Sequence, residues 1–470
     1  MMPSRKMRAH VMGAAAAGLA LRLLFIWQFP FYDSGDTQFY EQLARNWLKY
    51  GVYGLNVYGK LVPVDMRAPG YPALLAAIYT PFGHAPVAVM LTQAAVDLAS
   101  CFLIAVLAAW VAPDNLRRRA GLAALWLAAL CPFTANYTAT VLSEVLAMFF
   151  TVLALVILLT PSGLVDLPRQ DYVRKVNVTC FVGGLATGLG TLVRPETPLL
   201  LVAVGLILAA RCWRPQEWPK AARAGLWMVI GLLLPLLPWA ARNWITLHKV
   251  QFLAARYSQL PGEYVPRGFY AWTNTWLWRF RDVYLVPWKL DDEELHIEDL
   301  PPAAFDNPEE HERVAELFDH YNETTTISPS VDQGFAKLAR ERTARHPLRT
   351  YVSIPVRRTF VMWFTPRVEM LPFSGHLWPP GERWEDDPVD FSVTILFGLL
   401  NFLYAGLAIA GAWIARRRPA VAFLVVFVLL RTAFFTRVET PEPRYMLECL
   451  PAILALAAQF WTRQSSARPI

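Results

Sequence analysis

Residues 32–72 read YDSGDTQFYEQLARNWLKYGVYGLNVYGKLVPVDMRAPGYP and form the first long polar stretch of the chain. An apolar segment precedes this stretch and further apolar segments follow it, while Asp33, Asp36 and Arg67 lie within it. Ionisable side chains next to membrane spans usually face a wet cavity or one another. The stretch therefore predicts a polar site at the edge of a bilayer, and the other segments are best understood by their position relative to it.

The composition indicates a polytopic membrane protein. Of the 470 residues, 55% are hydrophobic and only 17% are charged, and the mean hydropathy is +0.31. A soluble chain of this size is more polar and more highly charged. The net charge of +7 comes from short basic clusters between apolar runs, a pattern typical of residues that orient spans in a bilayer, so nucleic acid is not expected as a partner. No pair of the five cysteines shows metal-binding spacing, and we expect no metal held by cysteines.

Apolar runs of about 20 residues, the length that spans a bilayer, divide the chain. We predict an all-α polytopic fold of about ten spans. They lie near residues 11–30, 86–111, 120–139, 141–160, 176–193, 197–211, 224–241, 391–414, 420–435 and 445–462. The run at 71–83 is about 13 residues long, which favours an interfacial helix over a full span.

The basic clusters set the predicted orientation. Arg5, Lys6 and Arg8 at the N-terminus, Arg117–Arg119 and Arg416–Arg418 all fall on one side of this arrangement, which the positive-inside rule assigns to the cytoplasm. We therefore expect both termini to be cytoplasmic. The predicted domains are an N-terminal membrane module, 1–242, with an outer loop at 31–85, then an outer domain at 243–390 and C-terminal spans at 391–470. Apolar positions at helical spacing predict one helix of the outer domain at 309–321.

Several polar residues fall on the predicted outer face although they are far apart in the sequence. Besides Asp33, Asp36 and Arg67, they are Tyr40, Glu144, Arg194, Arg242, Glu439, Glu442, Arg444 and Tyr445. Arginine suits phosphate because its planar fork makes two parallel charge-assisted hydrogen bonds. A carboxylate nearby can take a proton from an attacking hydroxyl. Together these residue types predict transfer from a lipid-linked phosphate to an alcohol.

At these positions the sequence resembles the C-type integral-membrane glycosyltransferases, in the branch of the lipid A aminoarabinose transferase and the protein mannosyltransferases. The similarity covers residues 11–242 and 391–462. The matching segments are DTQFY (36–40), RAPGYP (67–72), VLSEVLAM (141–148), LVRP (192–195), PWAARN (238–243) and PEPRY (441–445).

The resemblance implies inverting transfer of one monosaccharide from a polyprenyl-phosphate donor to a hydroxyl of a lipid, glycan or protein. Asp36 matches the family's base, and Arg67 stands where the aminoarabinose transferase has a lysine that contacts the donor phosphate. Arg242 and Arg444 are further expected phosphate ligands. The family's aspartate-glutamate pair is Asp36-Thr37 here, and Phe39 replaces an arginine, so the acceptor and the use of a divalent cation stay open.

Other interpretations exist for the same residues. Asp36 can cap the helix that follows it, Glu144 can be an interfacial residue at a helix N-terminus, and Arg22 in the first span is expected to snorkel or pair internally. A transporter or flippase of an amphiphilic anionic lipid is the rival function, because intramembrane charges also mark transport paths. Against it, the polar residues gather on one face, and no pair of interrupted helices repeats across two halves.

Overall fold

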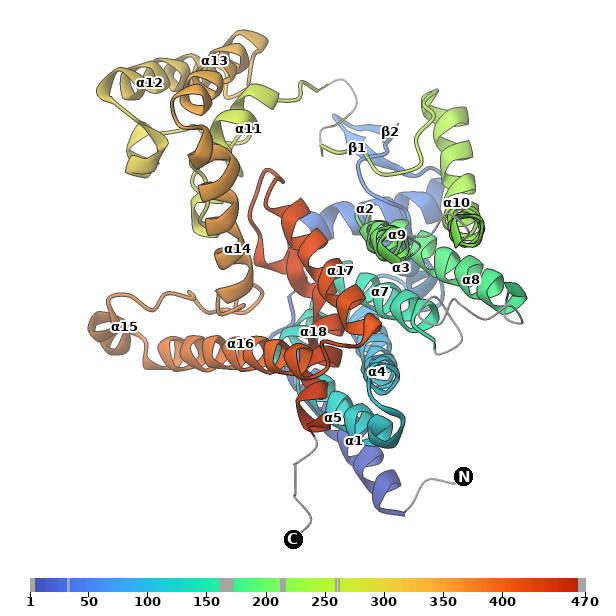
Figure 1. The fold of residues 1–470 in the computed structure, drawn as a ribbon. Helices are drawn as coiled ribbons and strands as arrows, with labels where there is room; N and C mark the ends of the chain where they lie inside the picture. The colour runs from blue at the N-terminus through green and yellow to red at the C-terminus, as the bar shows by residue number, and fades with distance from the viewer. Residues whose placement is uncertain are drawn as a thin grey trace. The chain divides into compact units, whose positions relative to one another are not determined.

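The computed structural model describes residues 5–31, 34–160, 173–211, 217–257, 260 and 263–463. The chain divides into two compact units. The first, here called the membrane unit, contains Met1–Arg256, Pro366–Leu430 and Leu447–Ile470. The second, here called the inserted unit, contains Tyr257–Thr365 and Arg431–Met446. Both units are built mainly of helices (Figure 1), which confirms the predicted all-α class.

Among the residues that the structure describes, five helices are long and apolar enough to cross a membrane. Four of them are α1 (Arg5–Gln28), α4 (Pro86–Val111), α10 (Trp218–Leu247) and α16 (Pro388–Ile414). The fifth, Pro443–Thr462, joins η10 (Pro443–Cys449), α18 (Leu450–Ala457) and η11 (Ala458–Thr462). Shorter apolar helices occupy four other predicted spans: α7 (Glu144–Leu158), α8 (Val173–Thr191), α9 (Leu199–Arg211) and α17 (Pro419–Phe435). The prediction of a multi-pass membrane protein is therefore confirmed.

The segment expected as one straight span at 120–139 is bent. After η1 (Asp114–Leu116), α5 (Arg117–Ala129) is followed by α6 (Pro132–Ala135) and η2 (Asn136–Ala139), and the two parts meet at 50°. Pro132 causes the break, because its ring disfavours the helical conformation at the residue before it. Cys131 accordingly has an extended backbone, with φ −71° and ψ 110°.

The polar loop after α1 contains α2 (Gly35–Tyr50), the strands β1 (Gly54–Val57) and β2 (Lys60–Pro63), and α3 (Gly70–Phe82). α3 is the short apolar helix expected from the sequence, whereas the antiparallel hairpin was not predicted. Tyr58 and Gly59 connect its strands with φ values of 48° and 78°, as a two-residue type I′ turn requires.

Arg22 on α1 forms an ion pair and hydrogen bonds with the neighbouring helices α4 and α5 of the membrane unit. Its guanidinium lies 2.6 Å from Oδ2 of Asp97 on α4 and donates to the carbonyl of Ala129 at the end of α5 (2.9 Å). Both charged side chains are buried, and α1, α4 and α5 pack side by side (Figure 1). Of the two alternatives expected for Arg22, snorkelling and internal pairing, the structure shows internal pairing. Its cost of desolvation is offset because its hydrogen-bonding groups find partners.

α8 and α10 approach each other closely because glycines face each other across their contact. A Cβ on Gly184 would meet the Met228 carbonyl at 2.2 Å, and one on Gly231 would meet the Phe181 carbonyl at 2.1 Å. Small residues at such crossings let two backbones pack directly, as is common between membrane helices. The contact holds the end of α10 next to the turn that follows α8.

The inserted unit has its own aromatic core. It comprises α11 (Arg267–Thr273), η6 (Phe280–Val283), η7 (Ile297–Asp299), η8 (Pro302–Ala304), α12 (Pro308–Asn322), α13 (Pro329–Arg345), η9 (Arg349–Ser353) and α14 (Ile354–Phe364), whereas α15 (Pro380–Asp386) belongs to the membrane unit. The helix expected at 309–321 is α12. Trp272, Trp276, Phe318 and Phe335 are buried together.

Candidate active site

Asp36 and Arg67 form an ion pair in the loop after α1. The Arg67 guanidinium donates to Oδ1 of Asp36 over 2.6 Å, and the side chains are 22% and 23% exposed, respectively. The interpretation of Asp36 as the helix cap is wrong, because the side chain of Ser34 accepts the hydrogen bond from the Thr37 amide. Asp36 therefore lies in the first turn of α2 with its carboxylate directed at Arg67, and the pair stays reachable by a solute.

The backbone around Arg67 is held from two sides. The Tyr53 hydroxyl donates to the carbonyls of Arg67 (2.9 Å) and Ala68 (3.3 Å). The Gly70 amide donates to the Leu192 carbonyl over 2.6 Å, where a Cβ would lie 2.6 Å from that same oxygen. Only glycine fits this approach without displacement. The motif RAPGYP thus fastens Arg67 to the turn after α8.

Tyr40 lies one helical turn after Asp36, on the buried side of α2. Its ring packs edge-on against Tyr71 with centroids 5.0 Å apart, and its hydroxyl lies 3.5 Å from the Ser143 hydroxyl. Burial raises the pKa of Tyr40 above its ordinary value, although the nearby charge of Arg67 opposes this. The phenol is therefore a neutral hydrogen-bonding group next to the Asp36–Arg67 pair.

A second charged cluster is centred on Arg194. Its guanidinium lies 2.9 Å from Glu144, 2.8 Å from Glu196 and 3.5 Å from Glu448. The Thr151 hydroxyl donates to the other oxygen of Glu448 over 3.1 Å. All three carboxylates are largely buried. Because the Arg194 guanidinium already faces three carboxylates, the cluster does not by itself offer a site for phosphate.

α2 connects the two clusters. The Thr37 hydroxyl donates to the Val141 carbonyl over 3.1 Å, and Tyr40 reaches Ser143, the residue before Glu144. The structure therefore brings Asp36, Tyr40 and Arg67 close to Glu144 and Arg194 within one unit. Glu196 and Glu448 were missed as candidates, although a single carboxylate in the apolar run YMLECL was a usable signal for Glu448.

Arg242 fastens the same loop to the end of α10. Its guanidinium donates to the carbonyls of Val64 (2.8 Å) and Tyr53 (2.5 Å) and lies 5.1 Å from the centre of the Trp239 ring. A cavity of about 500 Å³ adjoins it. Its lining includes Trp47, Tyr53, Pro69, Leu192, Trp239 and Arg242. Aromatic and aliphatic walls with a cationic group among them suit a lipid chain that carries a phosphate.

The four candidates near the last span belong to the inserted unit, where Glu442, Arg444 and Tyr445 form a cluster. Arg444 lies 2.5 Å from one oxygen of Glu442, and the hydroxyl of Tyr445 donates to the other over 2.6 Å. Tyr445 also stacks on Phe435 with centroids 4.6 Å apart. Glu439 acts electrostatically on the buried Arg358, whose pKa burial lowers to about 10. Asp33, the remaining candidate, lies outside the described residues.

Among the described residues, no group of three or more His, Cys, Asp or Glu side chains is arranged to hold a metal ion. The three carboxylates of the membrane unit that do gather, Glu144, Glu196 and Glu448, are directed at Arg194.

Comparison with known proteins relates the chain to solved membrane glycosyltransferases. No protein-family model matches the sequence, and no curated protein matches it. The oligosaccharyltransferase of Archaeoglobus fulgidus tethered to an acceptor peptide aligns with a TM-score of 0.51 at 12% identity, covering 97% of this chain and 49% of that one. The oligosaccharyltransferase AglB of the same organism, with an inhibitory peptide and dolichol-phosphate, gives 0.50 at 11% identity, covering 97% and 50%.

ArnT from Cupriavidus metallidurans in the apo state aligns with a TM-score of 0.39 at 13% identity, covering 95% of this chain and 76% of that one. The chain spans about half the length of the two oligosaccharyltransferase structures. At these identities the likeness concerns the fold. The two oligosaccharyltransferase structures confirm the fold that the resemblance to the C-type membrane glycosyltransferases implied.

Proposed function

We propose that this protein transfers a monosaccharide from a polyprenyl-phosphate donor to a hydroxyl of a lipid, glycan or protein, with inversion at the anomeric carbon. The observation that carries the proposal is the partly exposed Asp36–Arg67 pair, 2.6 Å apart. It combines a carboxylate that can accept a proton with a guanidinium that can bind phosphate. The C-type fold supports glycosyl transfer in general, and the AglB structure solved with dolichol-phosphate supports a lipid-phosphate ligand.

In the proposed step, the donor phosphate recruits Arg67 and thereby releases the Asp36 carboxylate. The acceptor oxygen attacks the anomeric carbon while the bond from that carbon to the phosphate oxygen breaks. The acceptor proton goes to Asp36, and the electron pair of the broken bond stays on the phosphate, where Arg67 stabilises the charge. The products are the glycosylated acceptor and polyprenyl phosphate. One displacement from the opposite face inverts the configuration.

The neighbouring residues have supporting roles in this proposal. The polyprenyl chain lies in the cavity between Trp47 and Trp239, whose volume is about 500 Å³. Arg242 keeps the loop in place, because it already donates to two loop carbonyls. The Tyr40 phenol orients the acceptor hydroxyl next to Asp36. The site faces the outer side of a bacterial inner membrane, with both termini in the cytoplasm, as the basic clusters predict.

The test uses purified protein in lipid nanodiscs with a radiolabelled polyprenyl-phosphate sugar. Asp36→Asn keeps the shape of the side chain but removes the base, and we expect transfer to fall about 100- to 10,000-fold. Asp114→Asn is the matched control, because Asp114 is an exposed carboxylate that is also paired with an arginine, Arg117. Normal transfer by Asp36→Asn would refute the assigned base. Movement of the intact lipid between leaflets without cleavage would support a flippase instead.

A further inference from the structure

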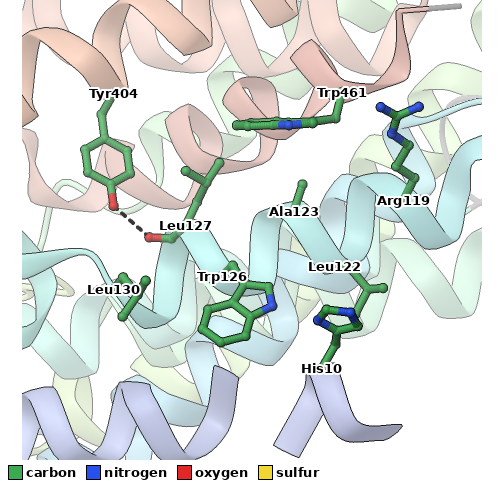
Figure 2. Close-up of a pocket in the computed structure, with 9 residues that line it drawn as sticks. All are labelled: His10, Arg119, Leu122, Ala123, Trp126, Leu127, Leu130, Tyr404 and Trp461. Atoms are coloured by element: carbon green, nitrogen blue, oxygen red, sulfur yellow. Dashed lines mark hydrogen bonds between the residues drawn. The ribbon is translucent and has the colours of Figure 1, made fainter. Parts of the chain in front are cut away.

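A second cavity, of about 440 Å³, lies in the membrane unit away from the Asp36–Arg67 pair. α5 and its C-cap residue Leu130 line one side of the cavity, and the other walls come from His10 on α1, Tyr404 on α16 and Trp461 on η11 (Figure 2). α1, α16 and the segment that contains η11 are all helices long and apolar enough to span a membrane. A lipid of the surrounding bilayer is therefore a suitable occupant for a cavity between these helices.

The walls between the two ends of the cavity are apolar. Leu122, Ala123, Trp126 and Leu127 follow one another along α5 and are partly buried, and Leu130 is 47% exposed. The hydroxyl of Tyr404 donates to the Leu127 carbonyl over 2.9 Å, so the phenol presents its ring to the cavity with its polar atom already satisfied. The eleven-residue rise from Arg119 to Leu130 is about 16 Å. This is close to half of the hydrocarbon core of about 30 Å, which is the depth of one leaflet.

Two cationic or hydrogen-bonding groups lie together at one end. Figure 2 shows Arg119 and His10 at the end of the cavity opposite Tyr404 and Leu130. Within the described part of the chain, neither side chain has a hydrogen-bond or ion-pair partner, whereas Arg117 of the same basic cluster is paired with Asp114 at 2.8 Å. An unpaired guanidinium at the end of an apolar groove favours an anionic headgroup, because basic pockets between membrane helices bind such groups.

We propose that this cavity binds one anionic glycerophospholipid of the surrounding leaflet, with its phosphate at Arg119 and His10 and an acyl chain along Trp126 and Leu130. Arg119 supplies the charge, and the imidazole of His10 supplies a hydrogen bond. The two indoles, Trp126 and Trp461, flank the chain. The lipid joins α1, α5, α16 and η11, and it is neither the donor nor the acceptor of the transfer reaction.

Native mass spectrometry of the purified full chain tests the proposal, with phosphatidylglycerol and phosphatidylcholine of equal chain length as probes. We expect one tightly retained phosphatidylglycerol and a preference of several-fold over phosphatidylcholine. Arg119→Gln lowers retention of phosphatidylglycerol about five-fold, the effect of one basic residue on anionic lipid. Ala123→Phe fills the groove and lowers retention of both lipids. Arg417→Gln is the matched control, since Arg417 is an exposed arginine of another basic cluster that does not line the cavity.

Thermal unfolding of each variant without added lipid shows whether the variant is folded, and so distinguishes lost binding from misfolding. Added phosphatidylglycerol should raise the melting temperature of the wild type and of Arg417→Gln but not that of Ala123→Phe. Equal retention of the two lipids by the wild type would overturn the assignment of the headgroup to Arg119. Unchanged retention by Ala123→Phe would overturn the assignment of the cavity. Displacement of the lipid by glycerol phosphate alone would show that the acyl chain contributes nothing, which also contradicts the proposal.

Discussion

The Arg67 guanidinium lies 2.6 Å from the Asp36 carboxylate although the two residues are 31 positions apart. α2 and the hairpin separate them in sequence, and the chain returns so that the loop before α3 meets the first turn of α2. The pair is partly exposed, and an exposed ion pair of this kind contributes little to stability. Its accessibility accords with a role in binding rather than in folding.

Substitutions of Arg67 should affect binding of the donor more than the chemical step. We expect Arg67→Ala to raise KM for the polyprenyl-phosphate sugar about 10- to 100-fold, since a hydrogen bond to a charged group contributes about 1.5–3 kcal/mol. Arg67→Lys keeps the charge but loses the fork, so its KM should lie between those of the wild type and Arg67→Ala. Initial-rate kinetics across donor concentrations measure both variants. An unchanged KM in Arg67→Ala would remove Arg67 from the donor site.

Gly70 is predicted to act through Arg67. A side chain at Gly70 would collide with the Leu192 carbonyl, so Gly70→Ala should shift the loop that carries Arg67 and lower transfer at least ten-fold. Gly406→Ala, in the middle of α16 with nothing within 4 Å of the added Cβ, is the control and should be neutral or slightly stabilising. Transfer rates and melting temperatures of the two variants check this. Full activity in Gly70→Ala would mean that the close contact is dispensable.

The buried Arg22–Asp97 pair should respond asymmetrically to substitution. Asp97→Ala leaves a guanidinium uncompensated among α1, α4 and α5, and we expect it to destabilise the protein by about 3–5 kcal/mol. Replacing both partners, as Arg22→Met with Asp97→Leu, should recover most of that loss. Asp114→Ala breaks only an exposed pair and should cost under about 1 kcal/mol. Thermal unfolding in detergent ranks the three, and equal losses for the single and double variants would contradict the argument.

The inserted unit should lose stability in acid through Asp306. Burial alone would raise the pKa of Asp306, but hydrogen bonding to Arg349 and the charges of Arg342 and Arg345 lower it below its ordinary value. A lowered pKa means that the stabilisation is complete above the unfolded-state value of about 3.9 and is lost as the pH falls through the folded-state value. The loss therefore begins below about pH 4.

Hydrogen exchange of peptides from α12 and α13, corrected for the intrinsic rate at each pH, measures this effect. Asp306→Asn should remove this part of the pH dependence while lowering protection at neutral pH. Glu293→Gln is the control, because Glu293 is a largely exposed carboxylate 3.9 Å from Lys289. An identical acid response in the wild type and Asp306→Asn would assign the effect to other carboxylates.

The sequence by itself determined the helical class of the fold, the apolar helices of the membrane unit, and the existence of the helices α3 and α12. These follow from the length of hydrophobic runs and from helical periodicity. Both are local properties of the sequence that determine which segments a bilayer or a small core can bury. For Arg22 the cost of a charge in the middle of a span left two alternatives, snorkelling and internal pairing, and the structure decided for pairing with Asp97. The C-type resemblance rested on short motifs, and the solved structures bear it out at the level of the fold.

Only the tertiary structure decided which residues cap the helices, where a span bends and which charged groups pair. Ser34 rather than Asp36 caps α2, Pro132 bends an expected straight span, and Glu448 reaches Arg194 from the far end of the chain. Ion pairs and caps depend on atoms within about 4 Å of each other, and residues distant in sequence come that close only after the helices have packed. Periodicity shows which face of a helix is buried, but not which charged group it meets there.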